Sequence, residues 1–371
     1  MDATVYLQKA FLLAQKANPK DIRPNPFVGA IIVDENGAIK GQGFHKKLGE
    51  AHAEVYAIQE ALENQTDLSK STLYVTLEPC SHFGKTPPCS DLIVQHKIKK
   101  VVIGSMDHNP KVSGAKILSE AGIEVEIIPL AEIEKLNQVF MINQQLQRPR
   151  YILKTATTVN GSIADSNGNS KWISNEKSRQ YVHRVLRSKV DAILTSAKTV
   201  LQDNAKLNIR IEDQEEKEQH LIILDKDLSI LKNKELALFY KRTNTKIYLV
   251  SHLDIPKNLD EFIEMIQVPL LDGHLDLKTL SQKLLEKNIC EVLIEAGGRL
   301  NAAFISNNLV DELNIFICPK IITDSSSINA FESSIAQEMN NAYSLELFEV
   351  KQFDADILLR YHYRNEKERG G

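Results

Sequence analysis

The chain has few cysteines, no long apolar run and no large excess of charge. Four cysteines in 371 residues are too few for a disulfide framework. No segment approaches the roughly 18 uninterrupted apolar residues of a membrane-spanning helix. Charged residues interrupt the apolar positions of the amino-terminal segment MDATVYLQKAFLLAQKA, which is typical of an amphipathic helix and not of a signal peptide. We therefore expect a cytoplasmic protein with no membrane partner.

A broad basic surface is also lacking. The net charge of −4 offers nothing that would attract a nucleic acid, so we expect no such partner. The pattern G-x-G-x-x-G of a true Rossmann domain follows none of the candidate strands. What is present is ordinary globular composition, with 43% apolar and 25% charged residues, and a length that suggests two domains with a core each.

Strand-like apolar runs alternate with helical patterns along both halves, which predicts two α/β domains. Strands are expected at 27–33, 71–77, 99–105, 123–129, 151–159, 190–196, 220–225, 246–251, 290–298, 312–322 and 355–364. Helices are expected at 51–62, 114–122 and 175–189, and a solvated loop at 212–219. The segment LQRPR at 146–150 resembles a boundary. We assign 1–146 to the first domain, 147–366 to the second and 367–371 to a frayed tail.

Two of the cysteines, Cys80 and Cys89, lie close together in the segment LEPCSHFGKTPPC at 77–89. Proline fixes φ and has no amide hydrogen, so this segment is a shaped loop and not the middle of a helix or of a central strand. The two thiols could form a disulfide, bind a metal, or do neither. In a reducing compartment a close cysteine pair is more often a metal site than a disulfide.

The segment AHAEV supplies His52 and Glu54, which complete a candidate zinc site. A catalytic zinc needs three protein ligands and an open position for water, and H-x-E followed by P-C and a further cysteine resembles the zinc deaminase signature. Residues two apart do not share a face of a regular helix, so both side chains reach one site only where the helix begins. We predict that His52, Cys80 and Cys89 bind Zn²⁺ and that Glu54 carries protons. Each residue alone is more often an ordinary surface histidine or thiol, and only their combination in this order favours zinc.

The segments NPFVGAIIV, GEAHAEVYAI and TLEPCSHFGKTPPC together resemble the deaminase half of the bifunctional riboflavin-biosynthesis deaminase/reductase family. The eight residues between the two cysteines exceed the usual C-x-x-C, and a long loop at this point is the norm in that family. The second half matches as well, so the resemblance runs over nearly the whole chain. It implies a cytidine-deaminase-like α/β/α layered domain followed by a dihydrofolate-reductase-like α/β domain.

The resemblance also implies the two reactions. A diaminopyrimidinone that carries a ribosylamino 5′-phosphate loses its ring amine at C2, and hydride from NADPH then opens the ribosyl group to a ribityl chain. In the first half, Asn25 would bind the pyrimidine, and His45, His82 and Lys85 would face the ribose phosphate. His45 and Lys85 could otherwise be plain solvated residues.

In the second half the resemblance implies two sets of residues. The substrate set is Lys154, Ser170, Arg187, Leu207, Arg210 and Glu295, and the NADPH set is Ala156, Trp172, Thr199, Asp203, Gly297, Gly298, Arg299, Leu300, Asn301, Ala302 and Ala303. Local physics also favours the glycines, because a strand, two glycines and a helix form a phosphate cradle, although such a turn is often only a turn. Without the resemblance, Trp172 could be a packing residue, and Arg187 and Arg210 could be solvated charges.

Two positions depart from the family pattern. Asn160 stands where aspartate is common before Gly161, and Ala205 stands where proline is frequent. The resemblance further implies a homo-oligomer, dimer or tetramer, formed through the second half. Two alternatives stay open: a zinc deaminase that acts on nucleobases, and a reductase-like half that is a degenerate, non-catalytic module. NADPH binding would separate them.

Overall fold

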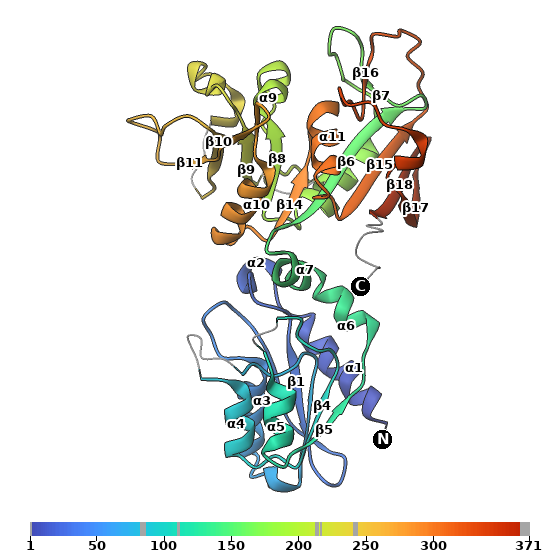
Figure 1. Ribbon diagram of the computed structural model, residues 1–371. Helices are drawn as coiled ribbons and strands as arrows, with labels where there is room; N and C mark the ends of the chain where they lie inside the picture. Colours follow the sequence, from blue (N-terminus) through green and yellow to red (C-terminus); the bar gives the residue numbers. More distant parts are fainter. Residues whose placement is uncertain are drawn as a thin grey trace. The chain divides into compact units, whose positions relative to one another are not determined.

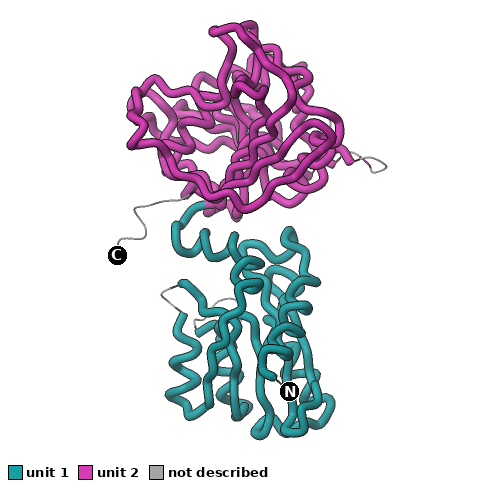
Figure 2. The backbone as a smooth tube through the Cα atoms, turned by 90° about the vertical axis from the view of Figure 1, so that its right-hand side faces the viewer, with its two compact units in different colours: residues 1–148 teal, residues 149–371 magenta. Residues whose placement is uncertain are grey.

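The computed structural model describes residues 2–81, 87–109, 112–211, 215, 217–239 and 244–363. Figure 1 shows the elements, and Figure 2 the two compact units, residues 1–148 and 149–371. Each unit has its own sheet and its own buried core. None of the described helices is long and apolar enough to cross a membrane. The expected loop at 212–219 lies partly, and the expected tail wholly, outside the described residues.

The first unit is a five-stranded sheet between two helical layers, seen in the lower part of Figure 1. The strand order is β2-β1-β3-β4-β5, with β1 antiparallel to both neighbours and β3, β4 and β5 parallel. Helix α1 packs on one face, and α3, α4 and α5 pack on the other. The bounds are α1 Ala3–Ala14, α2 Pro19–Ile22, β1 Gly29–Val33, β2 Ile39–Phe44, α3 Ala53–Glu63, β3 Thr72–Val75, α4 Cys89–Gln95, β4 Lys100–Ile103, α5 Gly114–Glu120, β5 Glu124–Ile127, α6 Ala131–Leu136 and α7 Gln138–Leu146.

Strand β2 is an element that the sequence analysis did not predict. Its sequence IKGQGF lacks an apolar run, and its two glycines argue against a strand. The structure shows why glycine is needed. A Cβ at Gly41 would lie 2.0 Å from the carbonyl oxygen of Ala57, and a Cβ at Gly43 would lie 2.4 Å from that of Ala53. The glycines therefore let the backbone of α3 lie directly on β2.

The second unit contains a nine-stranded sheet of order β11-β10-β9-β8-β14-β6-β15-β18-β17. The pairs from β11 to β15 are parallel, and β18 and β17 add antiparallel at one edge. The strand bounds are β6 Arg150–Thr158, β7 Ser162–Ala164, β8 Ala192–Ser196, β9 His220–Leu224, β10 Ile247–Ser251, β11 Ile263–Gln267, β12 Leu270–Leu271, β13 His274–Leu275, β14 Glu291–Ile294, β15 Glu312–Cys318, β16 Ile328–Asn329, β17 Leu345–Phe353 and β18 Asp356–Tyr363. The sequence analysis missed β11 and β17 at the two edges, and the short pairs β7–β16 and β12–β13.

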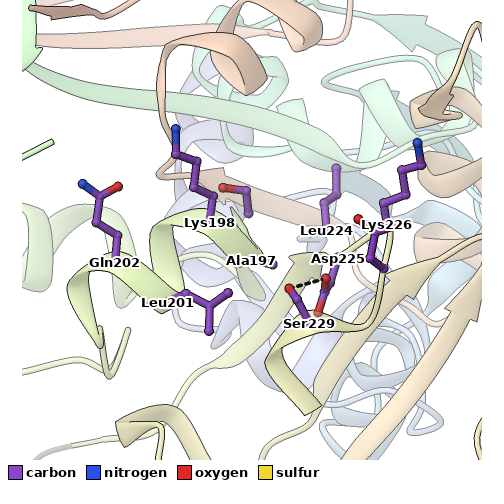
Figure 3. Close-up of a pocket in the computed structure, with 10 residues that line it drawn as sticks. Ala197, Lys198, Leu201, Gln202, Leu224, Asp225, Lys226 and Ser229 are labelled. Atoms are coloured by element: carbon purple, nitrogen blue, oxygen red, sulfur yellow. Dashed lines mark hydrogen bonds between the residues drawn. The ribbon is translucent and has the colours of Figure 1, made fainter. Parts of the chain in front are cut away.

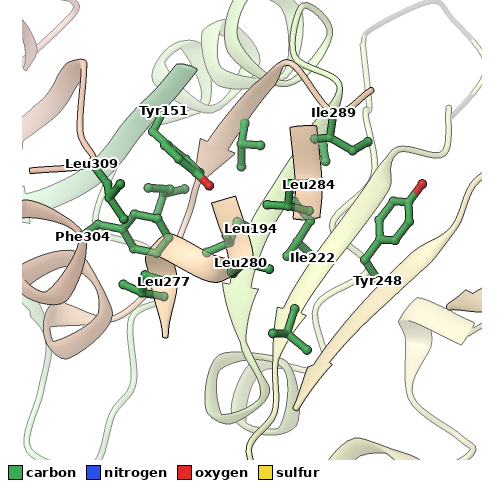
Figure 4. Packing of buried hydrophobic residues seen from close by; sticks show 14 of the residues in the cluster. Tyr151, Leu194, Ile222, Tyr248, Leu277, Leu280, Leu284, Ile289, Phe304 and Leu309 are labelled. Carbon is green, nitrogen blue, oxygen red and sulfur yellow. The ribbon is translucent and has the colours of Figure 1, made fainter. Parts of the chain in front are cut away.

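Helices cover both faces of this sheet. Figure 4 shows the larger core, where Leu280 of α10 and Phe304 of α11 pack on Tyr151, Leu194 and other strand residues. The opposite face is covered by α9 and by the segment that follows α8. The bounds are α8 Glu176–Tyr181, a π-helical segment Val182–Arg187, α9 Ala197–Asp203, α10 Leu277–Glu286 and α11 Gly298–Ser306. The predicted combination of an α/β/α layered domain and a mixed α/β domain is confirmed.

A buried ionic network crosses three strands of this sheet at the start of β6. The Arg150 guanidinium donates to Glu291 at 2.6 Å and to Glu312 at 2.5 Å, and all three side chains are buried. Arg360 of β18 adds a second guanidinium to Glu312 at 2.6 Å. Removal of one partner from such a network leaves an uncompensated buried charge, which costs about 3–5 kcal/mol.

Candidate zinc centre and reductase site

His52, Cys80 and Cys89 form one cluster in the first unit. His52 is the extended residue that precedes α3, so its side chain and that of Glu54 in the first turn leave the helix where it begins, as predicted. Cys80 lies in the loop after β3, and Cys89 is the first residue of α4. The His52 Nδ1 lies 3.2 Å from the Cys89 sulfur and 3.5 Å from the Cys80 sulfur. All four cysteines of the chain are free thiols.

The donor set fits zinc. A tetrahedral Zn²⁺ with ordinary bond lengths separates a nitrogen ligand from a sulfur ligand by about 3.6 Å, and the three ligand atoms here lie within 4.8 Å of one another. The Cys89 amide also donates to the Cys80 sulfur at 3.3 Å. Two sulfurs and one imidazole leave a fourth tetrahedral position open, which is the arrangement of a catalytic zinc and not of a structural one.

Without metal, the cluster carries one thiolate that can bind a cation, at Cys80. Hydrogen bonds from the Cys89 thiol and from His52 lower the pKa of Cys80 to about 4, although burial opposes them. The hydrogen bond to Cys80 and burial raise the pKa of Cys89, and the hydrogen bond to Cys80 raises the pKa of His52. A bound metal would displace the protons that Cys89 and His52 retain, so metal affinity falls at low pH.

Glu54 is buried beside this cluster. Burial raises the pKa of its carboxyl, and the charge of Cys80 raises it further. A carboxyl with a raised pKa accepts a proton more readily than an ordinary glutamate does, which suits a proton carrier. Glu54 thus lies beside the cluster in a setting that suits proton transfer next to a metal.

Asn25 and His45 lie next to the cluster as a hydrogen-bonded pair. The Asn25 side-chain nitrogen lies 3.0 Å from the His45 Nε2, the His45 Nδ1 lies 3.2 Å from the carbonyl oxygen of Ala51, and the His45 and His52 ring centroids are 5.7 Å apart. His45 is buried, and burial lowers its pKa, which favours a neutral ring. Its predicted contact with a phosphate stays a prediction. His82 and Lys85 lie outside the described residues.

The second unit brings Lys154, Arg187 and Glu295 together. The Arg187 guanidinium binds Glu295 through two hydrogen bonds of 2.6 and 2.8 Å. Burial alone would raise the pKa of Glu295, but Arg187 and Lys154 bring it to about 2, so Glu295 is a carboxylate. Burial lowers the pKa of Lys154, although Glu295 opposes the shift. Charged groups held this way offer both donors and acceptors to a polar ligand.

The remaining predicted substrate residues lie in two places. Leu207 is buried in the core and has a positive φ of 51°, whereas the Arg210 side chain is exposed. The amide of Arg210 donates to the Nδ1 of His183 at 3.0 Å. Ser170 is half-buried.

The glycine pair connects β14 to α11. Gly297 precedes the helix, and a Cβ on it would meet no atom within 4 Å, so a ligand can approach the backbone there. Gly298 is different, because its Cβ would lie 2.1 Å from the carbonyl oxygen of Asn329. The first amides of a helix have no acceptor inside the helix, which suits a phosphate. The free space at Gly297 would let a dinucleotide phosphate approach the backbone amides at the start of α11.

The other predicted NADPH residues differ in their surroundings. Leu300 and Ala303 pack against the core, and the buried Asn301 amide donates to the carbonyl oxygen of Ala330 at 3.0 Å. Trp172 is 62% exposed, which argues against a packing role, and the Arg179 guanidinium lies 4.5 Å from its ring centroid. Three more occupy strand β6 or helix α11 positions on the same unit: Ala156, Arg299 and Ala302.

A pocket of about 620 Å³ opens at the carboxyl ends of β8 and β9 (Figure 3). It is lined by the start of α9, next to the predicted Thr199 and Asp203, and by the segment 224–229. Lys198 and Lys226 rise from its two sides in Figure 3. The sequence analysis missed both lysines, although their places shortly after two predicted strands were a usable signal.

The two departures have local explanations. The Asn160 side chain accepts from the Thr158 hydroxyl at 2.8 Å and donates to the carbonyl oxygen of Ile322 at 2.6 Å. An aspartate could not make that donation. Asn204 has a left-handed backbone, and its side chain accepts from the amide of Ala237 at 2.8 Å, which fixes the loop before Ala205. Both turns are therefore held by asparagine side chains.

Comparison with known proteins agrees with both units. Residues 2–105 match the cytidine and deoxycytidylate deaminase zinc-binding region, and residues 149–359 match the RibD C-terminal domain. The chain is 37% identical to riboflavin biosynthesis protein RibD of Actinobacillus pleuropneumoniae over 363 residues, which are 96% of this chain and 94% of that protein. It is 38% identical to the RibD of Aquifex aeolicus over 331 residues, 87% of this chain and 88% of that one.

A solved structure from Thermotoga maritima is also similar. It is described as a diaminohydroxyphosphoribosylaminopyrimidine deaminase/5-amino-6-(5-phosphoribosylamino)uracil reductase, and its TM-score is 0.80 at 33% identity, with 98% of this chain and 99% of that chain covered. A RibD structure from Acinetobacter baumannii gives 0.78 at 32% identity, with the same coverage. Sequence, both domain matches and structure agree over nearly the whole length, and the chain belongs to the riboflavin biosynthesis protein RibD family.

Proposed function

We propose that the chain catalyses two consecutive steps of riboflavin synthesis. The first unit removes the amine at C2 of 2,5-diamino-6-(5-phosphoribosylamino)pyrimidin-4-one by hydrolysis, and the second reduces the ribosyl group of the product with NADPH. The observation that carries the proposal is the cluster of His52, Cys80 and Cys89 with the buried Glu54 beside it, in a chain whose second half matches the RibD C-terminal domain. No observation favours a degenerate second half.

In the deaminase site each residue has one role. His52, Cys80 and Cys89 would hold Zn²⁺, which lowers the pKa of a bound water toward neutrality. Glu54 takes a proton from the attacking water and delivers it to the leaving amine, and its raised pKa suits both transfers. With the proton from Glu54, the C2 amine leaves the ring as ammonia.

Substrate recognition in the first unit rests on Asn25. Its amide can read donors and acceptors on the pyrimidine ring, and His45 orients it through the 3.0 Å contact. His45 is buried and neutral, so it supplies no full charge to a phosphate. We therefore assign the phosphate charge of this site to Lys85, one of the residues that the resemblance implies.

In the reductase site, NADPH supplies a hydride for C1′ of the ribosyl group. Gly297 and the first amides of α11 would receive its pyrophosphate, and the pocket beside Thr199 would receive one end of the dinucleotide. Lys198 and Lys226 add positive charge to that pocket, as a phosphate at this end requires. Lys154, Arg187 and Glu295 would hold the phosphorylated sugar. Burial lowers the pKa of Lys154, which makes it a better proton donor to the ring oxygen as the sugar opens.

We further propose a homo-oligomer formed through the second unit. The edge strand β17 exposes a row of apolar side chains, among them Leu347 at 49% and Val350 at 56% exposure. Exposed apolar edge strands are sites of pairing with another chain. A second copy of this chain is the partner that closes such an edge symmetrically. The free thiols and the two-thiolate zinc site suit a reducing compartment, so we place the enzyme in the cytoplasm.

The test is a coupled assay with zinc-loaded protein, the diaminopyrimidinone substrate and NADPH. Ammonia release and NADPH oxidation are followed in one tube, and both are expected. In a second arm a chelator removes the metal, which should abolish ammonia release and leave NADPH oxidation intact when the deaminated substrate is supplied. Ammonia without NADPH oxidation would refute the reductase assignment. If zinc is bound and neither ammonia release nor NADPH oxidation occurs, the assignment of the substrate is wrong.

A further inference from the structure

The π-helical segment Val182–Arg187 carries two buried polar side chains that face the reductase site. His183 is 8% exposed and Arg187 is 9% exposed. Arg187 is accounted for by Glu295, whereas His183 belongs to none of the predicted sets. Segments of π-helix are uncommon and often occur at functional sites, where they redirect side chains. His183 is thus a buried polar group whose role is open.

Both side chains hold the same loop. Arg187 Nη1 donates to the carbonyl oxygen of Asn208 at 2.8 Å, and the amide of Arg210 donates to His183 Nδ1 at 3.0 Å. Both contacts are made to the loop that carries the two predicted substrate residues Leu207 and Arg210. The left-handed backbone at Leu207, with φ of 51°, makes this loop costly to hold without such partners.

The hydrogen bond at Arg210 fixes the state of the His183 ring. A backbone amide can only donate, so Nδ1 must carry a lone pair, and the ring is the neutral tautomer with its proton on Nε2. Burial lowers the pKa of His183 to about 4, and the charges of Arg187 and Arg210 contribute. At neutral pH the acceptor is therefore permanently available.

We propose that His183 is a positioning residue of the reductase. Through the amide of Arg210 it holds the loop that presents Leu207 and Arg210 at a fixed distance from the Arg187–Glu295 pair. The loop is then already ordered when the phosphorylated sugar binds, so binding does not have to order it. The inference rests on the proposed function, because it assumes that this loop contacts the phosphorylated substrate.

The test compares two variants of similar size in the full chain. H183L removes the acceptor, whereas the side-chain oxygen of H183N can take the place of Nδ1. In H183L we expect the KM for the deaminated phosphorylated substrate to rise about tenfold, because the amide of Arg210 loses its acceptor and the loop loses this anchor, with the KM for NADPH unchanged. H183N should lie near the wild type. An unchanged KM for NADPH in the same preparations reports that the second unit is folded.

Amide hydrogen exchange supplies a readout that needs no turnover. Exchange of the peptide 204–211 should accelerate in H183L and return toward the wild-type rate in H183N. An H183L protein with a loosened loop and an unchanged substrate KM would overturn the proposal, as would an H183N protein as impaired as H183L. A wild-type chain that oxidises no NADPH refutes the proposed function, and the exchange rates alone then decide whether His183 holds the loop.

Discussion

Gly41→Ala should damage the deaminase although it replaces none of the zinc ligands. The added Cβ would lie 2.0 Å from the carbonyl oxygen of Ala57, where ordinary contact begins at 3.4 Å. Helix α3 must therefore move away from β2 by about 1.4 Å, since the contact is with backbone and not with a flexible side chain. His52 and Glu54 sit at the start of that helix. A displacement of about 1 Å at reacting groups costs about 100-fold in rate.

The assay is ammonia release at saturating zinc, with NADPH oxidation by the same protein as an internal reference. We expect deaminase kcat/KM to fall about 100-fold and reductase kcat/KM to stay unchanged. Gly122→Ala is the matched control, because Gly122 has a φ of 82° and no atom within 4 Å of the added Cβ. It strains the backbone by about 1 kcal/mol but moves no helix. Full ammonia release by Gly41→Ala would refute the view that this contact sets the position of α3.

Three further predictions concern single side chains. Glu54→Gln should lower ammonia release by about 100- to 10,000-fold while zinc content by metal analysis stays at one per chain; loss of zinc would make Glu54 a structural residue. Replacing Lys198 and Lys226 together by Ala should raise the KM for NADPH about tenfold with little change in the substrate KM, measured by initial rates; an unchanged KM would exclude the pocket from the cofactor site. Asn160→Asp should lower the thermal midpoint, because the donation to Ile322 is lost, and should not raise reductase activity; a more active variant would contradict this.

The zinc cluster and Glu54 could be predicted from the sequence because these four residues carry their chemistry in their identities and spacing. His52 and Glu54 are two apart, which is compatible with one site only at a helix start, and α3 begins there. The apolar runs likewise predicted the central strands, since a buried strand must be apolar wherever it lies in the sheet.

Other features depend on contacts between segments far apart in the sequence. Strand β2 contains Gly41 and Gly43 because any larger residue there would clash with the backbone of α3. The edge strand β17 is exposed over its first half and only half-buried at alternate residues after that, so its sequence gives a weak signal. The hydrogen bond between His183 and the amide of Arg210 joins residues 27 positions apart. Because every residue except proline has a backbone amide, the residue types do not predict this bond. Such features need coordinates.

The separate cores of the two units have a genetic consequence. The buried clusters of residues up to 130 and those beyond 150 share no member, and the Arg150 network anchors the second sheet using only its own strands. A core substitution should therefore inactivate one activity and spare the other. Two mutant alleles with lesions in different units should complement each other in one cell and restore growth without added riboflavin. Two alleles with lesions in the same unit should not.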